Sequence, residues 1–280
     1  MPADPYPALS PAVIQAVQTL ARHALPAFGT ALLLLLAGIT TFWLAIARYG
    51  TRRDTSRHTP LAYLLAYLTA SFAAMAGAAA LFAEIAENVG DGRRLGQLDV
   101  MFSSAVGATV APTTLGVFAA LTHLGDPTTL AVLCVAGAIA LLSLKKVALC
   151  TAWVAAIAGN AVLNPALKGI FARARPVHET GLATPSGYSF PSGHSSGAVV
   201  AYGMLAYVLM RLLPPAHAAW RLPAVLAAAT IALTVCVSRI FLRAHFPSDV
   251  LAGIASGAIW LALCIGAVEL ASYRQIKVRR

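Results

Sequence analysis

The chain has 280 residues, of which 59% are hydrophobic and 11% are charged, and its mean hydropathy is +0.76. A soluble domain carries about 25% charged residues, so this composition excludes an ordinary soluble globular protein. The formal net charge is +10. Because the basic residues lie between apolar stretches and at the C-terminus, we interpret this charge as a signal of membrane topology and anionic lipid rather than of nucleic acid.

Seven apolar stretches are long enough to span a bilayer as helices, which takes about 20 residues each. They cover residues 28–48, 61–85, 127–144, 147–167, 195–213, 222–240 and 248–271. Residues 8–25 show weak amphipathic periodicity, which predicts a helix on the membrane surface. Residues 96–122 are apolar but contain Gly107, Pro112 and Gly116, so we expect one or two short interfacial or re-entrant helices there. The predicted fold is all-α, a polytopic transmembrane helix bundle.

The distribution of basic residues predicts the orientation of this bundle. Of the 20 Lys and Arg residues, 12 would lie on the side of the 48–60 loop and the C-terminus, and 8 on the other side. Because basic loops stay in the cytoplasm, the segments 168–194 and 238–249 should both emerge at the outer face. This convergence depends on the two spans that separate the segments.

Lys168 is followed seven positions later by Arg175-Pro176. If the helix that starts near residue 147 continues, Lys168 and Arg175 lie on one of its faces, two turns apart, and can hold a tetrahedral anion. The planar fork of arginine donates hydrogen bonds in pairs to phosphate oxygens. The alternative is that both side chains extend from a helix end toward the membrane surface.

Pro191-Ser192-Gly193-His194 comes directly before the span at 195–213. Ser192 can cap that helix, and Gly193 allows close approach of a ligand to the backbone. The free N–H groups at a helix start bind anions, and His194 could exchange a proton beside such an anion. The alternative is an ordinary helix cap next to an interfacial histidine.

Ser238-Arg239 ends one span, and His245 and Asp249 begin the next. The spacing of four places the imidazole and the carboxylate near one face of the helix. Such a carboxylate holds the histidine tautomer and leaves the other ring nitrogen free as a nucleophile. The alternative is a surface ion pair at a helix that begins at Pro247.

Cations at membrane depth are costly and usually mark a site, so three such segments on one side of the membrane favour a shared function. We predict a phosphate that is held and then transferred. The predicted catalytic residues are His245, His194 and Asp249. The predicted phosphate-binding residues are Lys168, Arg175, Ser192, Gly193 and Arg239. The sequence has no paired acidic cluster with metal-ligand spacing, so we expect neither a metal nor a cofactor.

Other charges near these segments have simpler interpretations. Arg173 and Arg243 are expected to be loop residues or headgroup contacts. Asp126 is expected to be a charge on an outer loop.

The three segments resemble the signature of the type-2 phosphatidic acid phosphatase superfamily. That signature is Lys, six residues, Arg-Pro; then Pro-Ser-Gly-His; then Ser-Arg, five residues, His, three residues, Asp, and every position matches. The likeness extends over residues 99–271. The family includes bacterial undecaprenyl-pyrophosphate, phosphatidylglycerophosphate and lipid A phosphatases, glucose-6-phosphatase, and vanadium haloperoxidases. Common bacterial members have six spans, so residues 61–280 would form a six-span phosphatase core. Residues 1–60 would add a surface helix and one extra span.

The resemblance implies a metal-independent lipid phosphatase. His245 would attack phosphorus to form a phosphohistidine, Asp249 would orient His245, and His194 would protonate the leaving oxygen and then activate water. The expected partners are a lipid phosphate substrate, such as undecaprenyl pyrophosphate or a phosphatidyl phosphate, and bilayer lipids, but not nucleic acid. The expected location is a bacterial inner membrane, with the active site facing the periplasm. The alternatives are a phosphotransferase, a lipid A phosphatase, or a non-catalytic transporter or lipid-binding protein.

Overall fold

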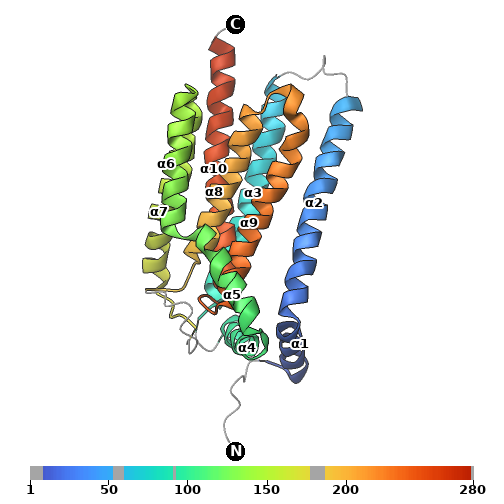
Figure 1. The fold of residues 1–280 in the computed structure, drawn as a ribbon, viewed down its shortest axis with the longest axis vertical. Coiled ribbons are helices and arrows are strands. Elements are labelled where there is room, and N and C mark those ends of the chain that lie inside the picture. The colour runs from blue at the N-terminus through green and yellow to red at the C-terminus, as the bar shows by residue number, and fades with distance from the viewer. Residues whose placement is uncertain (1–8, 53–59, 91–92, 177–186, 279–280) are drawn as a thin grey trace, which may run out of the picture.

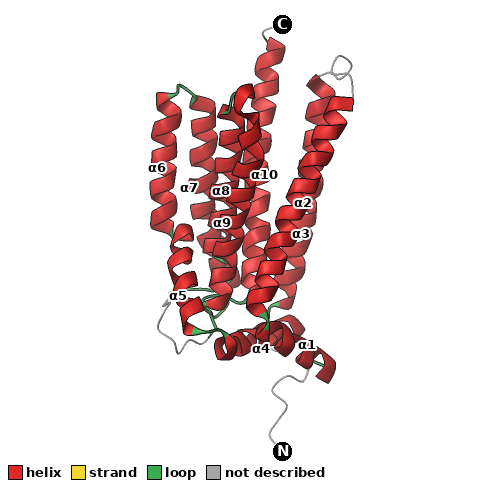
Figure 2. Ribbon diagram, turned by 45° about the vertical axis from the view of Figure 1, so that its right-hand side comes forward, coloured by secondary structure: helices red, strands yellow, loops and turns green. Residues whose placement is uncertain are grey.

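The structure is a computed structural model that describes residues 9–52, 60–90, 93–176 and 187–278. Every regular element within these ranges is a helix (Figure 2). Seven long helices form a bundle along one axis (Figure 1). They are α2 (Ala24–Arg52), α3 (Pro60–Asn88), α6 (Pro127–Ser143), α7 (Val147–Phe171), α8 (Gly193–Leu212), α9 (Arg221–Phe241) and α10 (Pro247–Val278). The predicted all-α bundle is confirmed.

Within the described ranges, six helices are long and apolar enough to cross a membrane, namely α2, α3 and α7 to α10. The predicted span at 127–144 is also helical, but α6 has only 17 residues. That length is at the lower limit for a bilayer, for which about 17 to 25 residues are usual. The chain is therefore a multi-pass membrane protein in which α6 is the shortest of the long helices.

Short helices cover one end of the bundle. They are α1 (Pro11–Arg22), α4 (Arg94–Thr109) and α5 (Pro112–Leu121), and η1 (Thr122–Gly125) leads from α5 into α6. A bend of 115° separates α4 from the segment formed by α5 and η1, because Pro112 forces the preceding Ala111 into an extended conformation with ψ 143°. Both views place α4 across the base of the bundle beside α1 (Figures 1 and 2). The predicted short helices within residues 8–25 and 96–122 are confirmed, and their position at the membrane surface stays a prediction.

The core surrounds α8, which packs against α7, α9 and α10. Two buried or partly buried tryptophans form hydrogen bonds between neighbouring helices. The indole of Trp153 on α7 donates to the carbonyl of Cys134 on α6 at 2.8 Å, and that of Trp260 on α10 donates to Ala156 on α7 at 2.9 Å. A Cβ at Gly137 would lie 2.6 Å from the Trp153 ring, so only glycine permits this close approach. The positions of α6, α7 and α10 relative to one another are thereby fixed.

Helix α2 lies at the outside of the bundle (Figure 1). No residue in its apolar window is buried, and Leu33 and Phe42 are each 69% exposed. Such side chains are suited to contact with lipid. The division of the chain into residues 1–60 and 61–280 falls beside residues 53–59, which lie outside the described ranges, and it stays a prediction.

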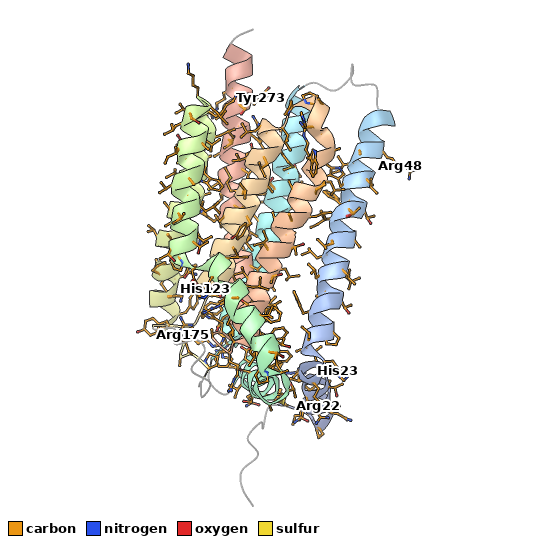
Figure 3. The ribbon with its side chains drawn as sticks, in the orientation of Figure 1. Arg22, His23, Arg48, His123, Arg175 and Tyr273 are labelled. Atoms are coloured by element: carbon orange, nitrogen blue, oxygen red, sulfur yellow. The ribbon has the colours of Figure 1, made fainter. Side chains whose placement is uncertain are left out.

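The ends of four long helices meet at the base of the bundle. Helices α7 and α9 end there, and α8 and α10 begin there, next to α4 and α5 (Figure 1). Figure 3 shows Arg175 and His123 at this end and Arg48 and Tyr273 at the opposite end. The two segments that were expected to emerge on one side therefore do so.

Candidate active site

A cavity of about 750 Å³ opens at the base of the bundle and extends between α6 and α7. Six of the eight predicted site residues line it, namely Lys168, Arg175, Gly193, His194, Arg239 and His245. The other two, Ser192 and Asp249, are completely buried behind its wall. The fold thus brings segments more than 70 positions apart in sequence around one space.

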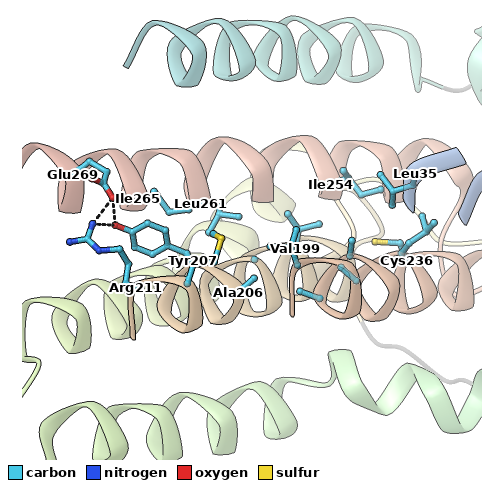
Figure 4. A pocket seen from close by; sticks show the side chains of 17 residues that line it. Leu35, Val199, Ala206, Tyr207, Arg211, Cys236, Ile254, Leu261, Ile265 and Glu269 are labelled. Carbon is cyan, nitrogen blue, oxygen red and sulfur yellow. Dashed lines mark hydrogen bonds and ion pairs between the residues drawn. The ribbon is translucent and has the colours of Figure 1, made fainter. Parts of the chain in front are cut away.

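A second cavity of about 660 Å³ lies between α8, α9 and α10 (Figure 4). Its wall is apolar except at one end, where Arg211 contacts both Tyr207 and Glu269. None of the predicted site residues is among the described residues that line it. The first cavity is therefore the candidate active site.

The two cations of the first signature segment do not share a helix. Helix α7 ends at Phe171, and Ala172 has a left-handed conformation with φ 45°. The predicted continuation of the helix to Arg175 is therefore wrong. Lys168 Nζ and Arg175 Nη2 instead both donate to the carbonyl of Tyr188, at 3.0 and 3.1 Å. The returning loop, rather than helical periodicity, brings the two cations together.

Ser192 occupies a structural position at the start of α8. Its hydroxyl accepts a hydrogen bond from the Ser195 N–H at 3.4 Å, as expected of a helix cap. Its own backbone N–H donates to the carbonyl of Asp249 at 2.9 Å, so in this structure that N–H is not directed at a ligand. Gly193 lines the cavity, and a Cβ there would lie 2.8 Å from the Asn164 side-chain oxygen. The absence of a side chain at Gly193 thus permits the Asn164 side chain to approach the start of α8 closely, and its part in phosphate binding stays a prediction.

His245 lies between its carboxylate partner and the cavity. Its Nδ1 is 3.6 Å from an oxygen of Asp249, and Ser189 Oγ is 3.4 Å from the same nitrogen. The opposite ring nitrogen, Nε2, is 3.1 Å from a guanidinium nitrogen of Arg175. Asp249 is held in turn by Ser189 Oγ and by the backbone N–H of Phe246. This geometry directs Nε2, the nitrogen that could act as a nucleophile, toward the cations.

The pKa of His245 is lowered from 6.5 to about 3, mainly by burial. Asp249 raises this pKa in part, whereas the positive charges of Arg175 and Arg239 lower it further. The imidazole is therefore neutral at pH 7, as a nucleophile must be. Between pH 6.5 and about 3 the unfolded chain binds a proton at this residue and the folded chain does not.

Folding stability should therefore fall as the pH is lowered through this range, and His245→Gln should reduce that dependence. Thermal unfolding in detergent between pH 7 and pH 4 measures both effects. If the unfolding midpoint of His245→Gln fell as steeply with decreasing pH as that of the parent protein, the low pKa of His245 would be contradicted.

Arg173 has a more important position than the sequence suggested. One of its guanidinium nitrogens lies 2.6 Å from Asp249 and another 2.8 Å from Asp99 on α4, and its side chain is 11% exposed. The guanidinium also stacks 4.4 Å from the centre of the Phe246 ring. Arg173 is a loop residue, as predicted, but it forms buried ion pairs instead of contacting a headgroup. The signal in the sequence was Asp99, because a carboxylate in an apolar interfacial helix requires a cation.

Replacing Arg173 by methionine should destabilise the protein strongly. The change leaves the carboxylates of Asp99 and Asp249, which are 2% and 0% exposed, without their counter-charge. Breaking a buried ion pair in this way costs about 3–5 kcal/mol. Thermal unfolding in detergent should show a large fall in the midpoint, whereas Arg22→Met on α1 should have little effect. A shift as small as that of the control would contradict the structural role.

His194 has a carboxylate partner that was not predicted. Its Nε2 lies 2.8 Å from one oxygen of Asp126, whose other oxygen is 2.7 Å from His123 Nδ1. Burial raises the pKa of Asp126, but hydrogen bonds and charge from the two histidines outweigh burial and lower it overall. The expectation that Asp126 is a simple loop charge is corrected, since it can orient His194 and stabilise its protonated form.

Arg239 supplies the third cation. It is 5% exposed, and its Nη1 donates to Thr122 Oγ1 on η1 at 2.9 Å. Its Nε is buried and has no hydrogen-bond partner among the described residues. A buried guanidinium with unused donors that lines a cavity is suited to an anionic ligand.

Comparisons with known proteins agree with the signature. Residues 147–272 match the family model of the PAP2 superfamily. These residues form a PAP2 superfamily domain. The matched region runs from α7 to α10 and contains every position of the three-part signature. The resemblance predicted from the sequence is confirmed.

Two curated proteins and one solved structure are similar to this chain. Phosphatidylglycerophosphatase B of Bacillus subtilis is 37% identical over 110 residues, which are 38% of this chain and 51% of that protein. Glucose-6-phosphatase 3 of Bos taurus is 39% identical over 90 residues, or 30% and 26% of the two chains. The chain thus spans about half, or less, of the length of these relatives.

The similar structure is the crystal structure of a transmembrane PAP2-type phosphatidylglycerolphosphate phosphatase from Bacillus subtilis. It superposes with a TM-score of 0.62 and 28% identity, covering 69% of this chain and 94% of that one. The bundle, and not only the signature, is therefore shared with a PAP2 membrane protein.

Proposed function

We propose that the chain is a lipid phosphatase that hydrolyses a phosphate or pyrophosphate group through a phosphohistidine on His245. One observation carries the proposal. His245, His194 and three cations surround a single cavity that continues between two membrane helices. The similarity to a curated sequence and to a solved structure that are both named as phosphatidylglycerophosphate phosphatases supports the same activity.

In the first step, Nε2 of His245 attacks phosphorus while the bond to the leaving oxygen breaks. His194 donates the proton that the leaving oxygen takes up. Asp249 faces Nδ1 of His245, so it holds the tautomer in which the Nε2 lone pair faces the cations, and it stabilises the charge that develops on the ring. The product is a phosphohistidine and a free lipid alcohol or phosphate.

In the second step, His194 accepts a proton from water, which attacks the phosphohistidine and releases inorganic phosphate. Asp126 stabilises the imidazolium that forms in this step. Lys168, Arg175 and Arg239 bind the phosphoryl oxygens, whose charge grows in the transition state. Fixed donors of this kind each contribute about 10²–10³ in rate.

We further propose that the site faces the periplasm of a bacterial inner membrane. The more basic side of the chain carries Arg48 and the segment that follows Tyr273, and these lie at the end of the bundle opposite to Arg175 (Figure 3). The rule that basic loops remain in the cytoplasm then assigns Arg175 to the outer face.

The experiment that tests the function is phosphate release by the purified protein in EDTA. The substrates are undecaprenyl pyrophosphate, phosphatidylglycerophosphate, phosphatidic acid and lipid A. We expect release from at least one of them, because the fixed cations supply the charge that a metal would otherwise provide. Activity on every lipid only after a divalent metal is added would refute the mechanism. Transfer of the phosphoryl group to glycerol without free phosphate would indicate a phosphotransferase instead.

A further inference from the structure

The part of the cavity that leads away from the catalytic residues lies between α6 and α7. Ala131 and Val135 on α6 and Ala158 and Ala161 on α7 line it, and all four are exposed on the outer surface of the bundle. Val135 alone is 59% exposed. In a bilayer these apolar walls contact lipid, so a hydrocarbon chain can occupy the gap while its phosphate lies at the catalytic end.

Two asparagines interrupt this apolar wall. Asn160 and Asn164 line the cavity on α7 and are only 6% and 7% exposed. Together with Lys168 they recur every four positions and therefore follow one face of the helix. With a rise of about 1.5 Å per residue, they lie about 12 and 6 Å deeper than the lysine. Buried amides at this depth are costly unless they form hydrogen bonds.

The two amides differ in how far the protein satisfies them. Asn164 Nδ2 donates to the Pro191 carbonyl at 3.3 Å and to Ser196 Oγ at 3.4 Å, so both its hydrogens are used. Asn160 Nδ2 forms one bond, to the same Ser196 Oγ, also at 3.4 Å. An amide can donate two hydrogen bonds and accept two. Within the described part of the chain, Asn160 therefore keeps one N–H donor for a group in the cavity.

The chemical structure of the lipid determines whether a hydrogen-bond acceptor lies beside the Asn160 amide. In a glycerolipid, ester carbonyls lie between the phosphate with its glycerol and the hydrocarbon chains. In a polyprenyl phosphate, hydrocarbon follows the phosphate directly, so a buried amide donor would remain unpaired beside it. We infer that Asn160 donates a hydrogen bond to an ester carbonyl and makes the site selective for glycerolipid over polyprenyl substrates. This inference rests on the proposed phosphatase function and adds a specificity-determining residue to it.

The test compares ester and ether lipids. Dioleoyl phosphatidic acid and its dialkyl ether counterpart differ only in the two carbonyls. One hydrogen bond corresponds to a preference for the ester lipid of about 3- to 10-fold in kcat/KM. We expect this preference in the parent protein, its loss in Asn160→Leu, and its partial recovery in Asn160→Gln. The ratio is measured within one sample, so it does not depend on the fraction of protein that is folded.

Two controls separate recognition from packing. Val162→Leu changes an exposed residue of α7 outside the cavity and should keep the parental ratio. Undecaprenyl pyrophosphate should be hydrolysed no more slowly by Asn160→Leu than by the parent protein.

Equal rates on ester and ether lipids, or an unchanged ratio in Asn160→Leu, would overturn the inference and leave the phosphatase function intact. An equal loss by Asn160→Leu on undecaprenyl pyrophosphate would assign Asn160 to packing and overturn it as well. Absence of phosphate release from all of these lipids would refute the proposed function itself, and the inference with it.

Discussion

His245→Ala should reduce phosphate release by at least about 10⁴-fold, the largest effect that we expect from any single substitution. His245 is the only predicted nucleophile, and its Nε2 faces the cation side of the cavity. No other imidazole in the described chain stands in the same relation to a carboxylate and a guanidinium. The measurement is the initial rate of phosphate release from the best lipid substrate, over a range of concentrations.

The same variant should still bind phosphate. Lys168, Arg175 and Arg239 remain in place, so the Kd for inorganic phosphate should change by only about 3-fold or less. His217→Ala, which alters an exposed histidine at the opposite end of the bundle, is the matched control and should keep full activity. Turnover above about 1% of the parental rate in His245→Ala would mean that another group attacks phosphorus. Loss of phosphate binding together with turnover would point to misfolding rather than to a lost nucleophile.

His194→Asn should produce the second largest loss, and its size should depend on the leaving group. With a lipid alcohol as leaving group, we expect a loss of about 10³-fold, because the alkoxide needs the proton that His194 supplies. With 4-nitrophenyl phosphate, the leaving phenolate is stable without a proton, so formation of the phosphohistidine should be much less affected. Attack of water on the phosphohistidine should remain slow, since no base activates the water.

These expectations predict a burst. After mixing His194→Asn with 4-nitrophenyl phosphate, about one equivalent of nitrophenolate should appear quickly, followed by slow turnover. Acid-labile phosphate should accumulate on the protein and be absent from His245→Ala. Equal losses on both substrates without a burst would remove His194 from proton transfer. Asp126→Asn should share part of the defect, since Asp126 lies 2.8 Å from His194 Nε2.

The positions of the helices follow from the sequence because membranes impose a simple rule. A spanning helix must be apolar over about 20 residues and satisfy its backbone hydrogen bonds internally, so its limits are visible in composition alone. The bend before α5 was also readable, because Pro112 restricts the residue before it. Helix α6 is the shortest of the predicted spans in the structure, and its 17 residues are near the lower limit for crossing a bilayer.

The contacts between the site residues could not be predicted as well from the sequence, because they depend on the conformation of the loops that follow the helices. Lys168 and Arg175 were placed together by an assumed helix that in fact ends at Phe171. They meet because the loop at Tyr188 accepts hydrogen bonds from both. Helical periodicity gave the correct neighbours for the wrong reason, since spacing along the chain says nothing about where a helix stops.

The two carboxylate partners illustrate the same limit. Asp126 precedes His194 by 68 positions, and Asp99 precedes Arg173 by 74. Because the partners are so far apart in the sequence, no local sequence pattern indicates either pair. From the sequence, each carboxylate could be recognised only as an isolated charge. Their roles arise because α4 and the start of α6 pack against the ends of α7, α8 and α10.

The sequence by itself determined the bundle, the placement of the signature segments at one end of it, and six of the residues that line the cavity. These follow from hydropathy, from the parity of the spans and from residue types whose burial in a membrane is costly. Only the tertiary structure decided which oxygen or nitrogen faces which partner, that the backbone N–H of Ser192 is bound to the Asp249 carbonyl, and that Asn160 lines the cavity with a single hydrogen bond to Ser196. The physical reason is that hydropathy is a property of each segment by itself. Hydrogen bonds of about 3 Å between segments instead depend on how several segments pack together.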